Sequence, residues 1–259
     1  MDLERIKDVG VAAAVKAGEV LRRYWGKAHT VRKKGVIDLV TEADVAAEEA
    51  ISSVIRTAFP THSIHAEEGG MSAGEEACKW IIDPLDGTTN YAHGLRDFAV
   101  SVAFAYEGVL VLGVVFSPIN EELFCAVEGR GATLNGRRVQ VSNVGDIGDA
   151  LLVTGFPYDL YTIVDPLMRR LRQCLVAAQG LRRLGSAALD LCHVACGRFD
   201  GFWEEHLSPW DTAAGTVIAR EAGATVTDFS NSPYHIEKKE ILATNGKIHE
   251  AMTRVLRLE

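Results

Sequence analysis

Residues Trp80 to Asn90 read WIIDPLDGTTN, and this stretch decides how the rest of the chain is interpreted. Its apolar start predicts a buried strand that ends at Asp83, and the proline that follows suits the first position of a helix. Asp86 comes three residues after Asp83, so both carboxylates can project from one tight turn. Gly87 has no side chain and therefore lets the backbone come close to a ligand.

The same turn predicts a site for a phosphate group. The amides of residues 87–89 would be unpaired at the start of a helix and free to hold an anion. Two carboxylates repel a phosphate, but Mg²⁺ between them would bind both, because it prefers hard oxygen ligands. Taken alone, an Asp-x-x-Asp pattern also fits a capped turn with solvated aspartates. The rest of the sequence has to decide between this and a metal-dependent phosphate site.

Further acids and helix starts lie outside this turn. Glu67 and Glu68 follow a predicted strand over Ser63–Ala66, at a strand end where sites of α/β proteins gather, although an exposed acidic loop fits as well. Ser208 to Asp211 predicts a helix start, where an acid also favours the helix dipole. The residues Gly185 to Ala187 predict another helix start. Its backbone amides would bind a ligand, or the segment would serve only as a helix cap.

Apolar spacing predicts both helices and strands along the whole chain. Helices are expected over 3–24, 41–59, 161–179, 186–196, 209–222 and 247–258. Strands are expected over 63–66, 80–83, 98–106, 109–116, 123–127, 138–141, 150–154, 199–203, near 226 and over 241–243. Because helices and strands occur in both halves of the chain, the fold class is α+β or layered α/β. We expect a single domain over 1–259, with a hairpin-rich half, 1–145, and an alternating half, 146–259.

Composition excludes several classes. The chain has 259 residues, of which 47% are hydrophobic and 24% charged, and this balance excludes disordered, collagen-like and coiled-coil proteins. A formal net charge of −8 disfavours a general nucleic-acid binder. The longest apolar runs, 98–106 and 109–116, are far short of the roughly 20 residues that cross a bilayer. No secretory signal is visible at the start.

The five cysteines are odd in number and form no Cys-x-x-Cys pair, which indicates free thiols and favours a reducing cytoplasm. Cys192, His193 and Cys196 offer three zinc-ligand types within about one helical turn, but no fourth ligand stands at a usual spacing. Small core residues beside a half-exposed histidine explain the pattern better. His93 is placed either to reach the site or to make a structural hydrogen bond.

Two long motifs resemble those of the inositol monophosphatase family of Mg²⁺-dependent, lithium-sensitive phosphatases. The first is Trp-x-x-Asp-Pro-x-Asp-Gly-Thr-x-Asn, at Trp80–Asn90, and the second is Trp-Asp-x-Ala-x-Gly, at Trp210–Gly215. Shorter matches lie at residues 38–44, 66–68, 155–158 and 184–187, in the family's order. The resemblance therefore covers nearly the whole chain, and it implies a layered α-β-α-β-α sandwich that forms a homodimer.

The resemblance also implies two or three magnesium ions in each active site. It assigns the first ion to Glu67, Asp83 and the Leu85 carbonyl, and the second to Asp83, Asp86 and Asp211. A third, weaker ion lies near Glu67 in the family.

The resemblance also implies that Thr88, supported by Asp44, orients the attacking water. Glu204, seven residues before Asp211, would bind a substrate hydroxyl. The basic residue of the family's N-terminal loop aligns to Lys33 or Lys34. The catalytic residues implied are Asp44, Glu67 and Thr88; the substrate-contacting residues are Asp86, Gly87, Thr88, Gly185, Ser186, Ala187, Glu204 and Asp211.

The expected chemistry is hydrolysis of a small phosphate monoester by direct in-line attack of water. Two metals about 3.5–4 Å apart can activate a water and stabilise the leaving oxygen. No Ser/His/Asp or Cys/His nucleophile motif is present, so no phosphoenzyme is expected. Residues 90–94, NYAHG, resemble the inositol branch, which favours myo-inositol 1-phosphate over histidinol phosphate or phosphoadenosine phosphate. Fructose 1,6-bisphosphate is the alternative substrate, and a non-catalytic regulatory binding protein is the alternative class.

Overall fold

The computed structural model describes residues 1–27, 31–33, 39–157 and 163–258. Its helices are α1 (Leu3–Tyr24), α2 (Glu42–Ala58), α3 (Thr88–Ala92), α4 (Val164–Ala177), α5 (Ala187–Ala195), α6 (Pro209–Glu221) and α7 (His249–Leu256), with a short 3-10 turn at Ile147–Asp149.

The strands form two sheets and one short pair, β1 (Val31–Lys33) with β2 (Leu39–Thr41). The large sheet has the order β10 (Arg137–Arg138), β9 (Ala132–Leu134), β8 (Glu122–Val127), β7 (Val109–Ser117), β6 (Ala99–Tyr106), β5 (Glu75–Asp86), β3 (His62–Ala66), β4 (Gly70–Met71). The small sheet has the order β12 (Gly180–Arg182), β11 (Leu151–Thr154), β13 (Gly201–Glu205), β15 (Glu240–Thr244), β14 (Thr225–Thr227).

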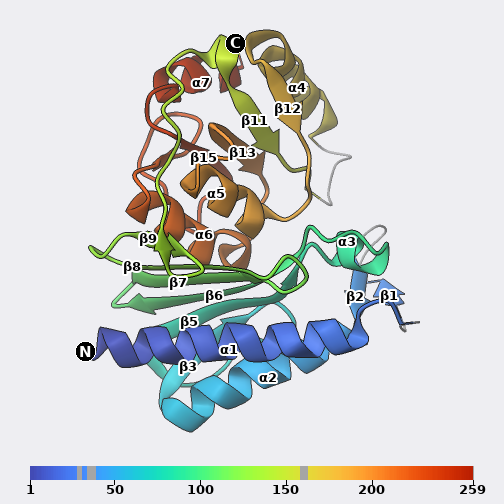
Figure 1. Ribbon diagram of the computed structural model, residues 1–259, viewed down its shortest axis with the longest axis vertical. Helices are drawn as coiled ribbons and strands as arrows, with labels where there is room; N and C mark the ends of the chain where they lie inside the picture. The colour runs from blue at the N-terminus through green and yellow to red at the C-terminus, as the bar shows by residue number, and fades with distance from the viewer. Residues whose placement is uncertain (28–30, 34–38, 158–162, 259) are drawn as a thin grey trace.

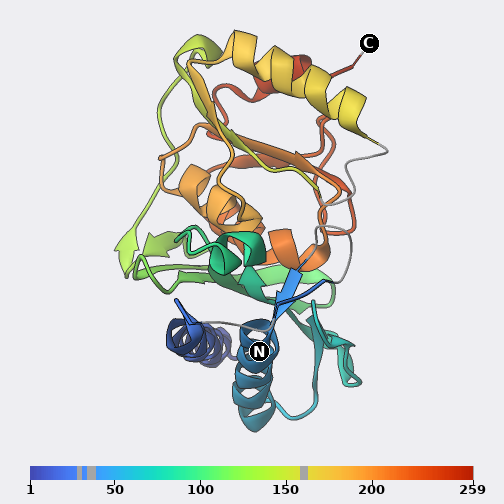
Figure 2. The ribbon, with the colours of Figure 1, turned by 90° about the vertical axis from the view of Figure 1, so that its right-hand side faces the viewer.

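Helices and sheets alternate in five layers (Figure 1), and the view turned by 90° shows the same stacking (Figure 2). Helices α1 and α2 cover one face of the large sheet with one apolar cluster, and α5 and α6 cover its other face with a second. A third cluster joins α5 to the small sheet, whose far face packs on α4 and α7. The expected α-β-α-β-α sandwich is therefore confirmed.

The central hairpin shows why the sequence folds this way. Every residue of β6 except Tyr106 is buried, because helices cover both faces of the sheet, and this accounts for its continuous apolar run. Glu107 and Gly108 join β6 to β7 with φ values of 50° and 81°. Such left-handed pairs match the twist of a two-residue hairpin turn.

Some element predictions were wrong in extent. The strand expected over 138–141 is reduced to β10, because the amide of Val141 bonds the Ala222 carbonyl (3.1 Å) instead of a neighbouring strand. Strand β5 starts at Glu75 rather than Trp80, since its exposed first part pairs with β3 and β6 without an apolar pattern. Its end was also predicted wrongly: β5 continues through Pro84 to Asp86, because pairing with β6 resumes there, and Pro84 does not open a helix. Strand β12 was not predicted. In the described ranges, no helix has both the length and the apolar character to cross a bilayer.

Candidate active site

One pocket gathers residues at the ends of seven helices and strands. The ends of β3 and β5 and the starts of α3, α5 and α6 face it, with the ends of β11 and β13 as its outer wall. Strand ends and helix starts are where α/β folds place ligands. The lining residues are Glu67, Asp83, Leu85, Asp86, Gly87, Thr88, Gly155, Phe156, Pro157, Arg183, Gly185, Ala187, Glu204, His206, Leu207 and Asp211.

The turn from β5 into α3 is built locally. Pairing of β5 with β6 shifts between Asp83 and Asp86, a bulge that redirects side chains. Oδ1 of Asp83 accepts a hydrogen bond from the Leu85 amide at 2.9 Å. Gly87 caps α3 at φ 95°, and a Cβ there would lie 2.9 Å from the Asp97 carbonyl oxygen, so only glycine fits.

Thr88 opens α3 and brings a distant residue to the pocket. Its hydroxyl lies 3.2 Å from Oδ1 of Asp44 and 3.0 Å from the Leu85 carbonyl oxygen, so either group can accept its proton. Asp44 is fully buried in the first turn of α2. The structure thus brings together the Thr88–Asp44 pair that the family resemblance implies.

Two further carboxylates are each anchored through one oxygen. Oδ2 of Asp86 accepts hydrogen bonds from the Ser186 hydroxyl (2.5 Å) and the Ala188 amide (2.8 Å), at the start of α5. Oδ2 of Asp211 accepts one from the Ser208 amide (2.7 Å), within the capping box of α6. These bonds fix both side chains at helix starts, where the dipole favours an anion.

Burial, and for Asp83 and Asp211 also the charges of neighbouring acids, raises the proton affinity of this cluster. Burial, and then the charges of Glu67, Asp86 and Asp211, raise the pKa of Asp83 well above its usual range. Burial raises the pKa of Asp86 to about 6, against the lowering effect of the bonds from Ser186 and Ala188. Burial and the charge of Asp86 raise the pKa of Asp211. The cluster is therefore unfavourable at neutral pH without a compensating cation.

The donor set fits magnesium. The groups that face the pocket at its acidic end are the carboxylates of Glu67, Asp83, Asp86 and Asp211 and the backbone of Leu85, so their ligand atoms are oxygens. Magnesium takes oxygen ligands, commonly one or two carboxylates together with substrate phosphate. The pocket therefore has the chemistry to hold Mg²⁺ next to a phosphate.

Of the other residues expected to contact substrate, Gly185, Ala187 and Glu204 line the pocket, whereas Ser186 does not. Glu204 is buried on β13, and burial, with the charges of Asp211 and Asp86, raises its pKa well above its usual range. Ser186 caps α5, and Gly185 precedes it at φ 95°. Gly155 lies against Glu204, since a Cβ at Gly155 would fall 2.1 Å from Oε2 of Glu204.

Arg183, His206 and Gly155 were not predicted as site residues. The guanidinium of Arg183 lies over the Phe156 ring, 5.7 Å from its centre. Gly155 lies within the stretch 155–158 that resembles the family, so this resemblance could have indicated it as a site residue. For Arg183 and His206 no sequence pattern indicated the pocket.

Other candidates do not reach the pocket. His93 is exposed and absent from its lining. Cys192 packs in the core, and Cys196 Sγ donates to the His193 carbonyl oxygen at 3.6 Å. Across the described ranges these three are not a set with mutually close ligand atoms, so the zinc alternative has no support. Lys34, Asp38 and Tyr158 lie outside the described residues, and Lys33 is described only as part of β1.

Comparison with known proteins assigns the chain to a family. The sequence profile of the "Inositol monophosphatase family" matches residues 2–258. The inositol-1-monophosphatase of Synechocystis is 44% identical over 98% of this chain and 90% of its own, and the Nus factor SuhB of Pseudomonas aeruginosa is 44% identical over 96% and 95%. The structure of the extragenic suppressor protein suhB from Bartonella henselae superposes with a TM-score of 0.94, at 42% identity, covering 97% and 98% of the two chains. This chain belongs to the inositol monophosphatase family and is a phosphatase.

Proposed function

We propose that this protein hydrolyses myo-inositol 1-phosphate to inositol and phosphate, with two or three Mg²⁺ ions in the pocket. One observation carries the proposal: Glu67, Asp83, Asp86 and Asp211, from three separate segments, line a single pocket together with the start of α3. An acidic oxygen cluster beside free helix amides is suited to a phosphate only through a divalent cation.

The ligands proposed are those of the family pattern. Glu67, Asp83 and the Leu85 carbonyl would hold one ion, and Asp83, Asp86 and Asp211 a second, with a third near Glu67. When bound, such ions lower the pKa of water and neutralise charge on the reacting phosphate.

The remaining steps belong to the chain's own residues. The amides of Gly87 and Thr88, at the start of α3, hold phosphate oxygens. Because the Thr88 proton is given to Asp44 or the Leu85 carbonyl, its hydroxyl oxygen is an acceptor that can orient water toward phosphorus. Attack is in line, and no residue is phosphorylated. Detection of a phosphorylated side chain during turnover would contradict this.

The alcohol part of the substrate lies toward β13. Glu204 accepts a hydrogen bond from a substrate hydroxyl, and the backbone at 185–187 approaches the ring closely, since Gly185 has no side chain. Fructose 1,6-bisphosphate is the second candidate substrate, and the observation that favours it is the cationic guanidinium of Arg183 in the same pocket.

A panel of substrates tests the proposal. Phosphate release is measured for inositol 1-phosphate, fructose 1,6-bisphosphate, histidinol phosphate and phosphoadenosine phosphate, each across a Mg²⁺ titration. We expect Mg²⁺-dependent release, fastest with inositol 1-phosphate. Release from none of them would favour a non-catalytic regulatory protein, a class suggested by the relatives that are named Nus factors.

Two further properties follow from the family resemblance. We propose that the protein is a homodimer and that lithium inhibits it. Light scattering coupled to size exclusion measures the first, and lithium titration of phosphate release the second.

A further inference from the structure

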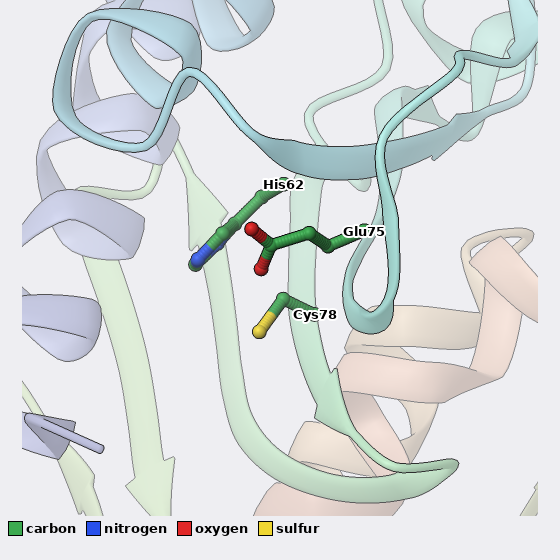
Figure 3. Close-up of side chains that lie close together, drawn as sticks. All are labelled: His62, Glu75 and Cys78. Atoms are coloured by element: carbon green, nitrogen blue, oxygen red, sulfur yellow. The ribbon is translucent and has the colours of Figure 1, made fainter.

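A second group of ligand-type side chains lies at the other end of the strands that lead to Glu67 and Asp83. His62 opens β3, while Glu75 and Cys78 lie in the first part of β5 (Figure 3). A ring nitrogen of His62, a carboxylate oxygen of Glu75 and Sγ of Cys78 all lie within 4.8 Å of one another. Three different donor elements therefore converge outside the active site.

A bulge in β5 creates this arrangement. His62 pairs with Glu75, but its neighbour Ser63 pairs with Lys79, so residues 76–78 are inserted opposite a single step of β3. In a regular strand, residues three apart point to opposite faces, and Glu75 and Cys78 would not meet. Bulges commonly redirect side chains, and this one places both on the side of His62.

The environment fixes His62 and leaves the group reachable. Its ring stacks on Phe59, with centres 4.5 Å apart and planes 8° apart, and lies 5.5 Å from the ring of Phe104. Cys78 is half-buried, whereas Glu75 is exposed. An ion can thus approach from solvent past Glu75.

We propose that His62, Glu75 and Cys78 bind a zinc-class divalent ion, with a water in the fourth position. Imidazole nitrogen, thiolate and carboxylate are the ligands that zinc takes in tetrahedral sites. Magnesium prefers oxygen ligands and would stay at the acidic pocket. The proposal does not rest on the catalytic function, because the two groups share no residue.

Binding has a consequence for Trp80. Its buried indole N–H donates to Nδ1 of His62 at 3.1 Å, so without an ion the proton of the neutral ring is on Nε2. An ion at Nε2 moves that proton to Nδ1, and an ion at Nδ1 displaces the indole directly. Either way the Trp80–His62 hydrogen bond breaks, which lowers the affinity and changes the surroundings of the indole.

Cobalt and zinc test the site in the full chain with Mg²⁺ saturating the active site. We expect Co²⁺ to give a thiolate charge-transfer band in the wild type and in the control Cys125→Ser, but not in Cys78→Ser. We expect Glu75→Gln to weaken zinc binding at least about tenfold in equilibrium dialysis. Phosphate release should be unchanged in Cys78→Ser, which separates this site from the proposed function.

The opposite results would overturn the site. These are no charge-transfer band in the wild type, a band that persists in Cys78→Ser, or zinc binding unchanged by Glu75→Gln. Tryptophan fluorescence gives an independent check, because zinc should shift it in the wild type and not in Trp80→Phe. An unshifted spectrum at saturating zinc would exclude coordination by His62.

Discussion

The hydroxyl of Thr88 donates toward Oδ1 of Asp44 over 3.2 Å, although 44 positions separate the two residues. Asp44 is fully buried at the start of α2, and Thr88 opens α3 at the pocket. A buried carboxylate behind a hydroxyl sets the direction of its proton and leaves the oxygen's lone pairs toward the pocket. This pair therefore links the packing of α2 to the orientation of water.

We expect Thr88→Ala and Asp44→Asn each to lower kcat by about 10²-fold or more, since each disturbs the group that orients water. The double variant should be no slower than the slower single variant, because both changes remove one shared function. The rate of phosphate release at saturating Mg²⁺, measured for the wild type, both single variants and the double variant, completes this double-mutant cycle. Fully multiplicative losses would mean that the two residues act independently.

Asp83→Asn should lower activity by at least about 10³-fold, because Asp83 is the proposed ligand of both ions. The matched control is Asp8→Asn, at an exposed position of α1, which should retain wild-type turnover. Phosphate release across a Mg²⁺ titration checks both. Near-normal turnover of Asp83→Asn would refute the metal assignment.

Gly155→Ala should lower kcat/KM for inositol 1-phosphate by about 10²-fold, because small misplacements of a binding group have such effects. The new Cβ would lie 2.1 Å from Oε2 of Glu204, so that carboxylate must move. Gly145→Ala is the control, since nothing lies within 4 Å of a Cβ there. Equal kinetics for the two variants would show that Glu204 does not hold the substrate.

Arg183→Gln should reduce kcat/KM for fructose 1,6-bisphosphate about tenfold more than for inositol 1-phosphate, since a charged hydrogen bond to the second phosphate is lost. Arg182→Gln is the control, because that exposed neighbour does not line the pocket. Measurement of kcat/KM for both substrates with each variant gives the ratio of the two reductions. An equal reduction for both would assign Arg183 no part in selecting a second phosphate.

Stability without metal should rise as the pH falls from about 8 toward 5. The folded state raises the pKa of Asp83, Asp86 and Asp211, so it binds more protons than the unfolded chain. Stability is then lost as pH rises from the ordinary value of 3.8 through the folded value, which is about 6 for Asp86. The midpoint temperature of thermal unfolding in EDTA, measured across this pH range, tests the expectation. Addition of Mg²⁺ should raise that midpoint most at the higher pH.

Asp211→Asn provides the control for this experiment. Removal of one carboxylate should raise the midpoint in EDTA at about pH 8 and shrink the Mg²⁺ effect, because less repulsion remains to be relieved. A midpoint in EDTA that increases with pH over the same range in the wild type would contradict the mutual repulsion of these acids.

Much of the architecture and of the central turn was predictable. The helices over 3–24 and 209–222 and the hairpin around Glu107-Gly108 follow from apolar periodicity and turn chemistry. The exposed first part of β5 and the three-residue strand β12 were not predicted, because neither has an apolar pattern. Their pairing is decided by neighbouring strands, which a local pattern does not contain.

The sequence by itself determined the close backbone approach at Gly87 and the helix start that follows it, because glycine and a helix start act on adjacent residues through local sterics and hydrogen bonds. Pairing with β6 decided that the strand continues through Pro84 to Asp86. The sequence also pointed to Glu67 and Asp211 through a strand end and a helix start. It named Asp44 and Glu204 only through resemblance to a family. That these residues meet, that Gly155 must lack a side chain beside Glu204, and that Arg183 faces the pocket were decided by tertiary structure. The reason is that contacts between segments far apart in the chain depend on how two sheets pack across α5 and α6, which no local spacing specifies.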